Sequence, residues 1–162
     1  MIQINVLPKE VEQAKRITAE FDAQKTYNKF ECSHNYIGYL GELVLDRYLT
    51  DNDISHEWVC FVKQGWTQPD FKINGLSVDL KTSYTSGLWF QRPIYDVYIQ
   101  AQLNEDNTIL TINGCISKEL LANAQVSGKA RKIEKNDRTD YVYDASKLYP
   151  LEVENSKIIF KY

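Results

Sequence analysis

The chain has 162 residues, 43% of them hydrophobic and 25% charged, which suits one globular domain spanning residues 1–162 with its own core. Its net charge of −3 argues against a protein that binds nucleic acid through bulk positive charge, because Lys and Arg contacts to phosphate dominate such binding. We expect a cytoplasmic protein without membrane contact, because there is no signal peptide, no apolar run near the ~18 residues of a membrane span, and no zinc or disulfide spacing among the three cysteines.

Two amphipathic helices are predicted near the N-terminus. Apolar residues recur at helical spacing over residues 8–25, which begin with a proline at a favoured first-turn position. A second apolar arc predicts a helix over residues 35–49, with Glu42 at its border. Gly38 and Gly41 lie inside this helix, where each glycine costs about 1 kcal/mol relative to alanine. That loss indicates either tight packing on a sheet or a ligand that approaches closely.

The next element is a strand. Residues 56–63 are rich in Trp, Val and Phe, and they predict a buried strand. His56 begins this strand, and it is a candidate metal ligand or base. A single histidine at a strand start is more often structural, and we favour that interpretation.

The segment 69–81 predicts a β-hairpin. Asn74-Gly75 stands between two alternating segments, and this dipeptide favours a two-residue type I′ turn, which needs positive φ at both positions. The turn pairs Ile73 with Leu76, and the register follows outward from that pair. One face of the hairpin is then apolar, and the other carries Asp70, Lys72, Ser77, Asp79 and Lys81.

Asp70 and Asp79 face each other in this register, in a non-hydrogen-bonded pair with Cα atoms about 4.5 Å apart. Like charges directly opposite destabilise a sheet, and a cation between them reverses the sign of the interaction. On an exposed face the two side chains can also splay apart into water. With Lys81 on the same face, the pattern is typical of a site that holds a hard divalent ion and cleaves phosphodiesters.

Pro69-Asp70, a short spacer and Asp79-Leu80-Lys81 resemble the PD-(D/E)XK signature of restriction-endonuclease-like nucleases. That family also places a glutamate on a helix upstream of the motif. Here Gly38-Tyr39-Leu40-Gly41-Glu42 is similar to the Gly-x-x-Gly-Glu pattern of many small bacterial and phage members. The resemblance covers roughly residues 36–81, with weaker support to about residue 116.

The resemblance implies an α/β fold with a restriction-endonuclease-like core, in which helices flank a central mixed β-sheet. It further implies a metal-dependent deoxyribonuclease. Asp70 and Asp79 would bind Mg²⁺ or Mn²⁺ together with the carbonyl oxygen of Leu80. Glu42 would complete the shell through water or a second metal.

Two further residues belong to the implied site. Lys81 would orient the nucleophile or stabilise charge that builds on the phosphate. Gln100, on the polar face of a later strand, would extend the site.

Residues 82–93 are polar and aromatic and predict an irregular connection. Trp89 and Phe90 lie in it, and they would either stack on bases or close over a core edge, which is the commoner role. The family commonly has a helix after the lysine strand, and the ten residues before Pro93 leave little room for one.

The remaining pattern predicts further strands and one helix. Alternation or apolar runs predict strands over residues 95–103, 108–116, 140–143 and 158–160. Ser117 is expected to cap a helix that ends near residue 124, and residues 145–148 are expected to form a helical turn. The densest basic segment follows Gly128 and holds Lys129, Arg131, Lys132, Lys135 and Arg138. We expect it either to be a solvated loop or helix face, or to contact phosphate groups.

The pattern as a whole predicts a divalent-metal-dependent nuclease whose partner is nucleic acid, with DNA favoured. One alternative is a module on the same fold that binds nucleic acid or serves a structural role without catalysis. The combination of Glu42, Asp70, Asp79 and Lys81 counts against it, because a pure binder does not need all four. A second alternative is a hydrolase that acts on RNA or free nucleotides. The sequence leaves the oligomeric state open, with a homodimer among the options.

Overall fold

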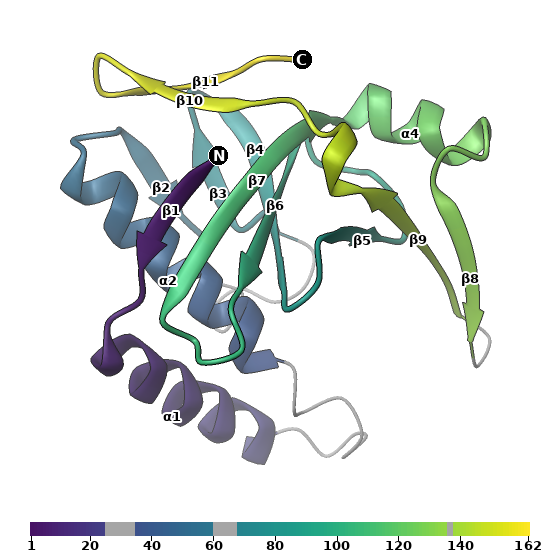
Figure 1. The fold of residues 1–162 in the computed structure, drawn as a ribbon. Coiled ribbons are helices and arrows are strands. Elements are labelled where there is room, and N and C mark those ends of the chain that lie inside the picture. The colour runs from purple at the N-terminus through teal and green to yellow at the C-terminus, as the bar shows by residue number, and fades with distance from the viewer. Residues whose placement is uncertain (25–34, 60–67, 136–137) are drawn as a thin grey trace.

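The computed structural model describes residues 1–24, 35–59, 68–135 and 138–162 as a mixed α/β protein (Figure 1). A six-stranded central sheet has the order β1-β7-β6-β4-β3-β2, and its neighbouring strands are antiparallel except β4 and β6. Figure 1 shows that this sheet is strongly curled. Its strands are β1 (Ile2–Asn5), β2 (His56–Trp58), β3 (Phe71–Ile73), β4 (Leu76–Ser83), β6 (Val97–Leu103) and β7 (Ile109–Ser117).

Helices and two smaller sheets surround the central sheet. The helices α1 (Pro8–Gln24) and α2 (Asn35–Asp51) pack on each other, and α2 packs on the central sheet. On the other side lie α4 (Lys118–Val126) and a three-stranded antiparallel sheet of β5 (Gly87–Phe90), β9 (Arg138–Asp144) and β8 (Arg131–Lys135) (Figure 1). A 3₁₀ turn (Ala145–Lys147) leads to a terminal hairpin of β10 (Leu151–Glu154) and β11 (Lys157–Phe160). In the described ranges, no helix has the length and apolar character that crossing a membrane requires.

Each face of the central sheet covers its own hydrophobic core. The larger core joins α2 to one face, where Phe71, Ile73 and Val78 of the hairpin are fully buried. The smaller core joins the other face to α4 and β5, and it includes Leu88 and Leu121. Because full burial of one such side chain contributes roughly 1.5–3 kcal/mol, the two cores hold the sheet edge between them in a fixed position.

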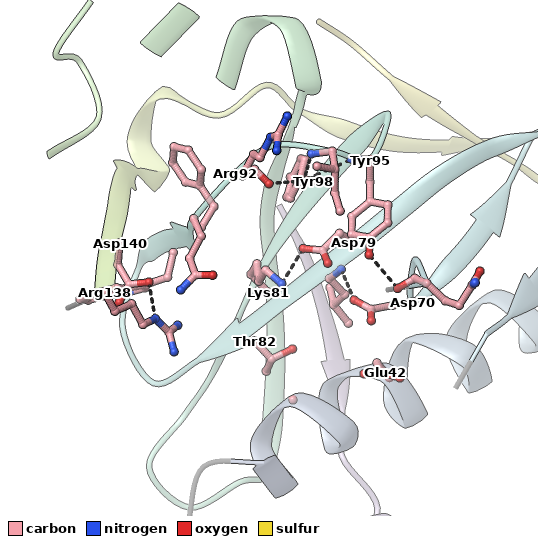
Figure 2. A pocket seen from close by; sticks show the side chains of 17 residues that line it. Glu42, Asp70, Asp79, Lys81, Thr82, Arg92, Tyr95, Tyr98, Arg138 and Asp140 are labelled. Carbon is pink, nitrogen blue, oxygen red and sulfur yellow. Dashed lines mark hydrogen bonds and ion pairs between the residues drawn. The ribbon is translucent and has the colours of Figure 1, made fainter. Parts of the chain in front are cut away.

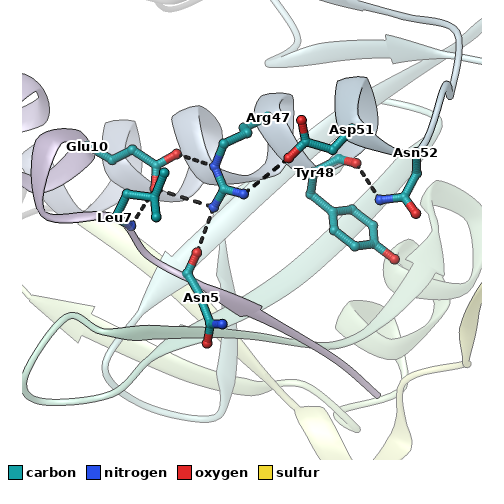
Figure 3. Close-up of polar contacts among 7 residues, drawn as sticks. All are labelled: Asn5, Leu7, Glu10, Arg47, Tyr48, Asp51 and Asn52. Atoms are coloured by element: carbon teal, nitrogen blue, oxygen red, sulfur yellow. Dashed lines mark hydrogen bonds and ion pairs between the residues drawn. The ribbon is translucent and has the colours of Figure 1, made fainter.

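A polar network fixes the two N-terminal helices to the sheet (Figure 3). The guanidinium of Arg47 donates from Nε to Glu10 Oε1 at 2.6 Å and from Nη2 to the carbonyl oxygen of Asn5 at 2.6 Å. Glu10 Oε2 also accepts the main-chain N–H of Leu7 at 2.7 Å, which satisfies one free donor at the start of α1. The network therefore joins β1, α1 and α2 around a carboxylate that is only 4% exposed.

Several predictions from the sequence are confirmed. The α/β class, the two N-terminal helices and the helix capped by Ser117 are present, and Ser117 Oγ accepts the N–H of Leu120. The hairpin has the expected register, with Phe71 opposite Val78 and Ile73 opposite Leu76. Asn74 has φ 54° and Gly75 has φ 78°, so both turn positions are left-handed as a type I′ turn requires.

Other predictions are wrong. Residues 82–93 are not irregular, because β4 continues to Ser83 and residues 87–90 form β5, which pairs with β9 more than 50 residues later in the chain. The basic segment is mostly a strand and not a loop or helix face, because residues 131–135 form β8, which pairs with β9; Lys129 lies before that strand. The strands β1 and β10 were not expected. The predicted strand over 56–63 is present to Trp58, and its part from residue 60 lies outside the described residues.

Candidate active site

The site lies where β3 ends and β4 continues beyond it, paired on its other side with β6. The ladder between them stops at the pair Phe71–Val78, one pair short of the expected Asp70–Asp79 pair. The Asp70 carboxylate instead accepts the N–H of the next residue of β4, Leu80, at 2.7 Å. In an extended strand the N–H and C=O of one residue point to the same side, so the Leu80 carbonyl also faces Asp70. Asp70 and the Leu80 carbonyl therefore share the edge of β4 at which the described chain offers no further strand.

Asp79 and Lys81 lie next to this edge on the same strand. Asp79 is 5% exposed, and its Oδ2 lies 2.8 Å from Lys81 Nζ. This contact is an ion pair without hydrogen-bond alignment. Asp79 Oδ2 has no hydrogen-bond partner in the described chain. Desolvation lowers the pKa of Lys81, but the carboxylates of Asp79 and Asp70 outweigh it and raise that pKa. Lys81 therefore stays charged, and its side chain remains 39% exposed toward the cavity.

Glu42 approaches the two aspartates from α2. It is 4% exposed, and its Oε2 accepts the indole N–H of Trp58 at 2.9 Å. Burial first, and then the charge of Asp70, raise the pKa of Glu42 well above its usual range. Burial and the charge of Asp79 likewise raise the pKa of Asp70 to about 7. Two of the three carboxyl groups thus resist ionisation in the absence of a cation.

The two glycines of α2 serve different purposes. A Cβ on Gly41 would lie 1.9 Å from Thr82 Oγ1, so the missing side chain allows α2 to approach β4 closely. A Cβ on Gly38 would meet nothing within 4 Å, and Gly38 lines the cavity. Tight helix–sheet packing therefore explains Gly41, and open space lies next to Gly38.

These groups line one side of a cavity of about 820 Å³ (Figure 2). Glu42, Asp70, Asp79 and Lys81 all contribute to it, as expected. The rest of the lining was not predicted as part of this site, and it includes Trp89, Arg92, Tyr95, Tyr98, Arg138 and Asp140. Trp89 and Arg138 were candidates from the sequence for stacking and for phosphate contact. Tyr98 also had a signal, because the alternation of residues 95–103 places it on the polar face; in the sheet it is the direct neighbour of Asp79 on β6.

Other predicted residues lie elsewhere. Gln100 is fully buried, its Nε2 donates to the Thr85 carbonyl at 3.1 Å and its Oε1 accepts from Asn113 at 2.5 Å, so it is not part of the cavity wall. His56 has a structural role, because its ring nitrogens lie 2.9 Å from Asp46 Oδ1 and 2.7 Å from the Ile54 carbonyl.

The basic segment contributes one residue to the cavity. Lys129, Arg131 and Lys132 are exposed and do not line it, whereas Arg138 does. Of the two aromatic candidates, Phe90 is 4% exposed and stacks on Tyr141 in the smaller core, and Trp89 is 40% exposed at the cavity.

The donor set fits a hard divalent cation with water in its shell. In the described chain no group of three His, Cys, Asp or Glu side chains lies close enough together to hold an ion alone. Mg²⁺ does not require such a group, because it keeps several waters and binds through one or two carboxylates plus substrate phosphate. The buried Asp79 Oδ2, which has an ion pair with Lys81 but no aligned hydrogen bond in the described chain, is the feature that a cation would satisfy. Asp70, Asp79 and the Leu80 carbonyl are the residues that would hold it, with Glu42 reaching it through water.

Comparisons with family models, with curated proteins and with solved structures find no match to this chain. Similarity therefore assigns neither a family nor an activity, and membership of the PD-(D/E)XK group stays a prediction from the motif. The features that bear on function are the three buried or half-buried acids, the lysine beside them and the cavity that they share.

Proposed function

We propose that this protein is a divalent-metal-dependent nuclease with a restriction-endonuclease-like core, and that it hydrolyses phosphodiester bonds, with DNA as the favoured substrate. One observation carries the proposal. The Asp70 carboxylate accepts the Leu80 N–H at 2.7 Å, at the point where β3 ends, and so joins Asp79 and Lys81 in one cavity. An amphipathic hairpin with merely solvated acids would instead keep its aspartates exposed in water, away from such a cavity.

Each residue has a role that its surroundings support. A bound Mg²⁺ or Mn²⁺ ion would supply Lewis-acid chemistry toward the phosphate. Lys81, kept charged by Asp79, is available to stabilise the negative charge that develops on the phosphate oxygens. Because Trp58 donates to Glu42 Oε2, the other oxygen, Oε1, is the one that can orient a water or hold a proton. The raised pKa of Glu42 favours proton uptake at that oxygen.

A second candidate is a nucleic-acid-binding module on the same fold without catalysis. It is favoured by one observation, namely that no three metal-ligating side chains of the described chain stand close together. The two candidates differ in turnover and not in the cavity, so a cleavage assay separates them.

The test is a cleavage panel of plasmid, linear duplex, single-stranded DNA and RNA with Mg²⁺, Mn²⁺ or chelator. We expect divalent-dependent cleavage that Asp79→Asn abolishes. The matched control is Asp106→Asn, because Asp106 is an exposed aspartate away from the cavity. No cleavage of any substrate with either ion would refute the nuclease proposal and leave the binding module.

A further inference from the structure

The cavity lining includes an exposed indole on β5. Trp89 is 40% exposed, whereas its neighbours on β5, Leu88 and Phe90, are 0% and 4% exposed and point into the smaller core. An exposed tryptophan alone needs no explanation. Trp89, however, lines the same cavity as Asp79 and Lys81, so its large apolar side chain borders whatever occupies the site.

Cationic groups also line the cavity. Arg92 is exposed, and the Arg138 side chain is 56% exposed and pairs with Asp140 at 2.9 Å. Counted with Lys81, the cavity lining holds three cationic groups against four carboxyl groups, so its formal charge is slightly negative. One divalent cation would make it slightly positive. A polyanion is therefore expected to enter the cavity only with the cation present.

The size and shape of the cavity decide which form of nucleic acid it takes. A volume of about 820 Å³ is that of a small-molecule pocket. The bases of a double helix are stacked on each other and cannot offer a face to an indole, whereas unpaired bases stack on aromatic side chains without regard to sequence. The indole can therefore stack on a base of an unpaired strand but not on a base inside an intact duplex.

We infer that the cavity binds an unpaired polynucleotide strand, with a base stacked on Trp89 and the backbone directed toward Lys81 and the carboxylates. This inference rests on the proposed function for the identity of the ligand. It deepens that function by assigning the substrate class, namely single-stranded, frayed or flapped nucleic acid. Arg92 and Arg138 would contact phosphates of the same strand at the cavity mouth.

The test is binding measured by fluorescence anisotropy with labelled oligothymidylate, oligouridylate and a DNA duplex of equal length. Ca²⁺ replaces Mg²⁺ so that binding is followed without turnover, and a denaturing gel checks that the probe stays intact. We expect the single strands to bind at least about tenfold more tightly than the duplex, and Trp89→Ala to weaken that binding roughly 5- to 150-fold. Trp89→Phe should retain most of it. The two single-stranded probes distinguish DNA from RNA as the source of the strand.

The matched control is Tyr149→Ala, because Tyr149 is 38% exposed and does not line the cavity. Three results would overturn the inference. They are equal binding of duplex and single strand, no binding of the single strands, and a Trp89→Ala protein that binds the single strands as tightly as wild type does. If wild type and Trp89→Ala cleave duplex DNA equally well, the inference fails and the nuclease proposal stands. If Trp89-dependent strand binding occurs without cleavage by any divalent ion, the nuclease proposal fails and the strand-binding site stands.

Discussion

Neutralising Asp70 should stabilise the metal-free protein at high pH and not at low pH. The Asp70→Asn change keeps an oxygen that can accept the Leu80 N–H and removes the charge next to Asp79 and Glu42. The pKa of Asp70 is about 7 in the folded protein, raised first by burial and then by Asp79. It is about 4 in an unfolded chain. The folded state therefore keeps a proton that the unfolded state loses, and the stability contributed by this group is full below about pH 4 and lost as the pH rises through about 7.

The magnitude follows from the shift. About three pKa units correspond to about 4 kcal/mol at most. Asp70 is half-buried, so solvent screening reduces the expected difference to roughly 2–3 kcal/mol. For a chain of this size that is about 4–12 °C in Tm. In chelator at about pH 8, Asp70→Asn should melt higher than wild type by this amount, and near pH 4 the two should melt together. Millimolar Mg²⁺ should raise the Tm of wild type and leave that of the variant almost unchanged.

The assay is thermal unfolding by circular dichroism across this pH range, with chelator and with Mg²⁺. Asp106→Asn, on the exposed turn between β6 and β7, is the control for the general effect of removing one negative charge. If Asp70→Asn is no more stable than wild type in chelator at high pH, the charge of Asp70 does not destabilise the folded protein. A wild type that gains nothing from Mg²⁺ would show that the acids do not bind the cation, and either result refutes the electrostatic account of the site.

Four other changes have defined outcomes. Lys81→Ala should reduce turnover roughly 10²–10³-fold while the Mg²⁺ concentration for half-maximal stabilisation stays nearly constant, and near-wild-type cleavage at saturating Mg²⁺ would remove the lysine from the mechanism. Gly41→Ala should lower the free energy of unfolding by about 1–3 kcal/mol, because its Cβ overlaps the side chain packed on it from β4. Gly38→Ala, with open space around its Cβ, should instead raise that free energy by up to about 1 kcal/mol, and urea titration of both variants checks the difference in sign. Arg47→Met should destabilise by about 1–3 kcal/mol, because it leaves buried Glu10 without its cation, and Glu10→Gln in the same chain should restore part of the loss on urea titration.

The parts of the structure that the sequence predicted are those with a local physical cause. The Asn74-Gly75 turn fixes its hairpin through two left-handed residues, so the register from Phe71 to Val78 follows without knowledge of the rest of the chain. Helix α2 follows from its own apolar arc, and Glu42 from its place on the border of that arc. The pairing of Asp70 with the Leu80 main chain was not predictable, because it depends on where the ladder ends.

The far wall of the cavity was not predictable for a different reason. Strand β5 exists because it pairs with β9, and the contact between them joins residues more than 50 positions apart. No local pattern distinguishes the four residues of β5 from a loop, and the same holds for β8, whose basic composition suggests solvated structure. Trp89 could be named from the sequence as an aromatic candidate, but only the β5–β9 pairing brings it to the cavity.

The acids that line the cavity are neutralised less completely than a buried acid elsewhere in the chain. This difference indicates that they serve a function at the cavity and do not stabilise the fold. Elsewhere the chain compensates such an acid. Glu10 is 4% exposed, and it has the guanidinium of Arg47 at 2.6 Å and an N–H of the helix start as partners.

At the cavity the balance is different. Glu42 and Asp70 have raised pKa values, the Oδ2 of Asp79 has no aligned hydrogen bond in the described chain, and Lys81 is the one described cation whose ion pair with these acids is observed. Such a group of acids destabilises the folded state unless something positive joins it, and replacement by amides would relieve the cost without changing the packing. Buried Glu10 is fully paired through Arg47, so the same kind of pairing would be possible at the cavity. Under the proposed function, this charge would contribute to the binding of a cation and of the phosphate that accompanies it.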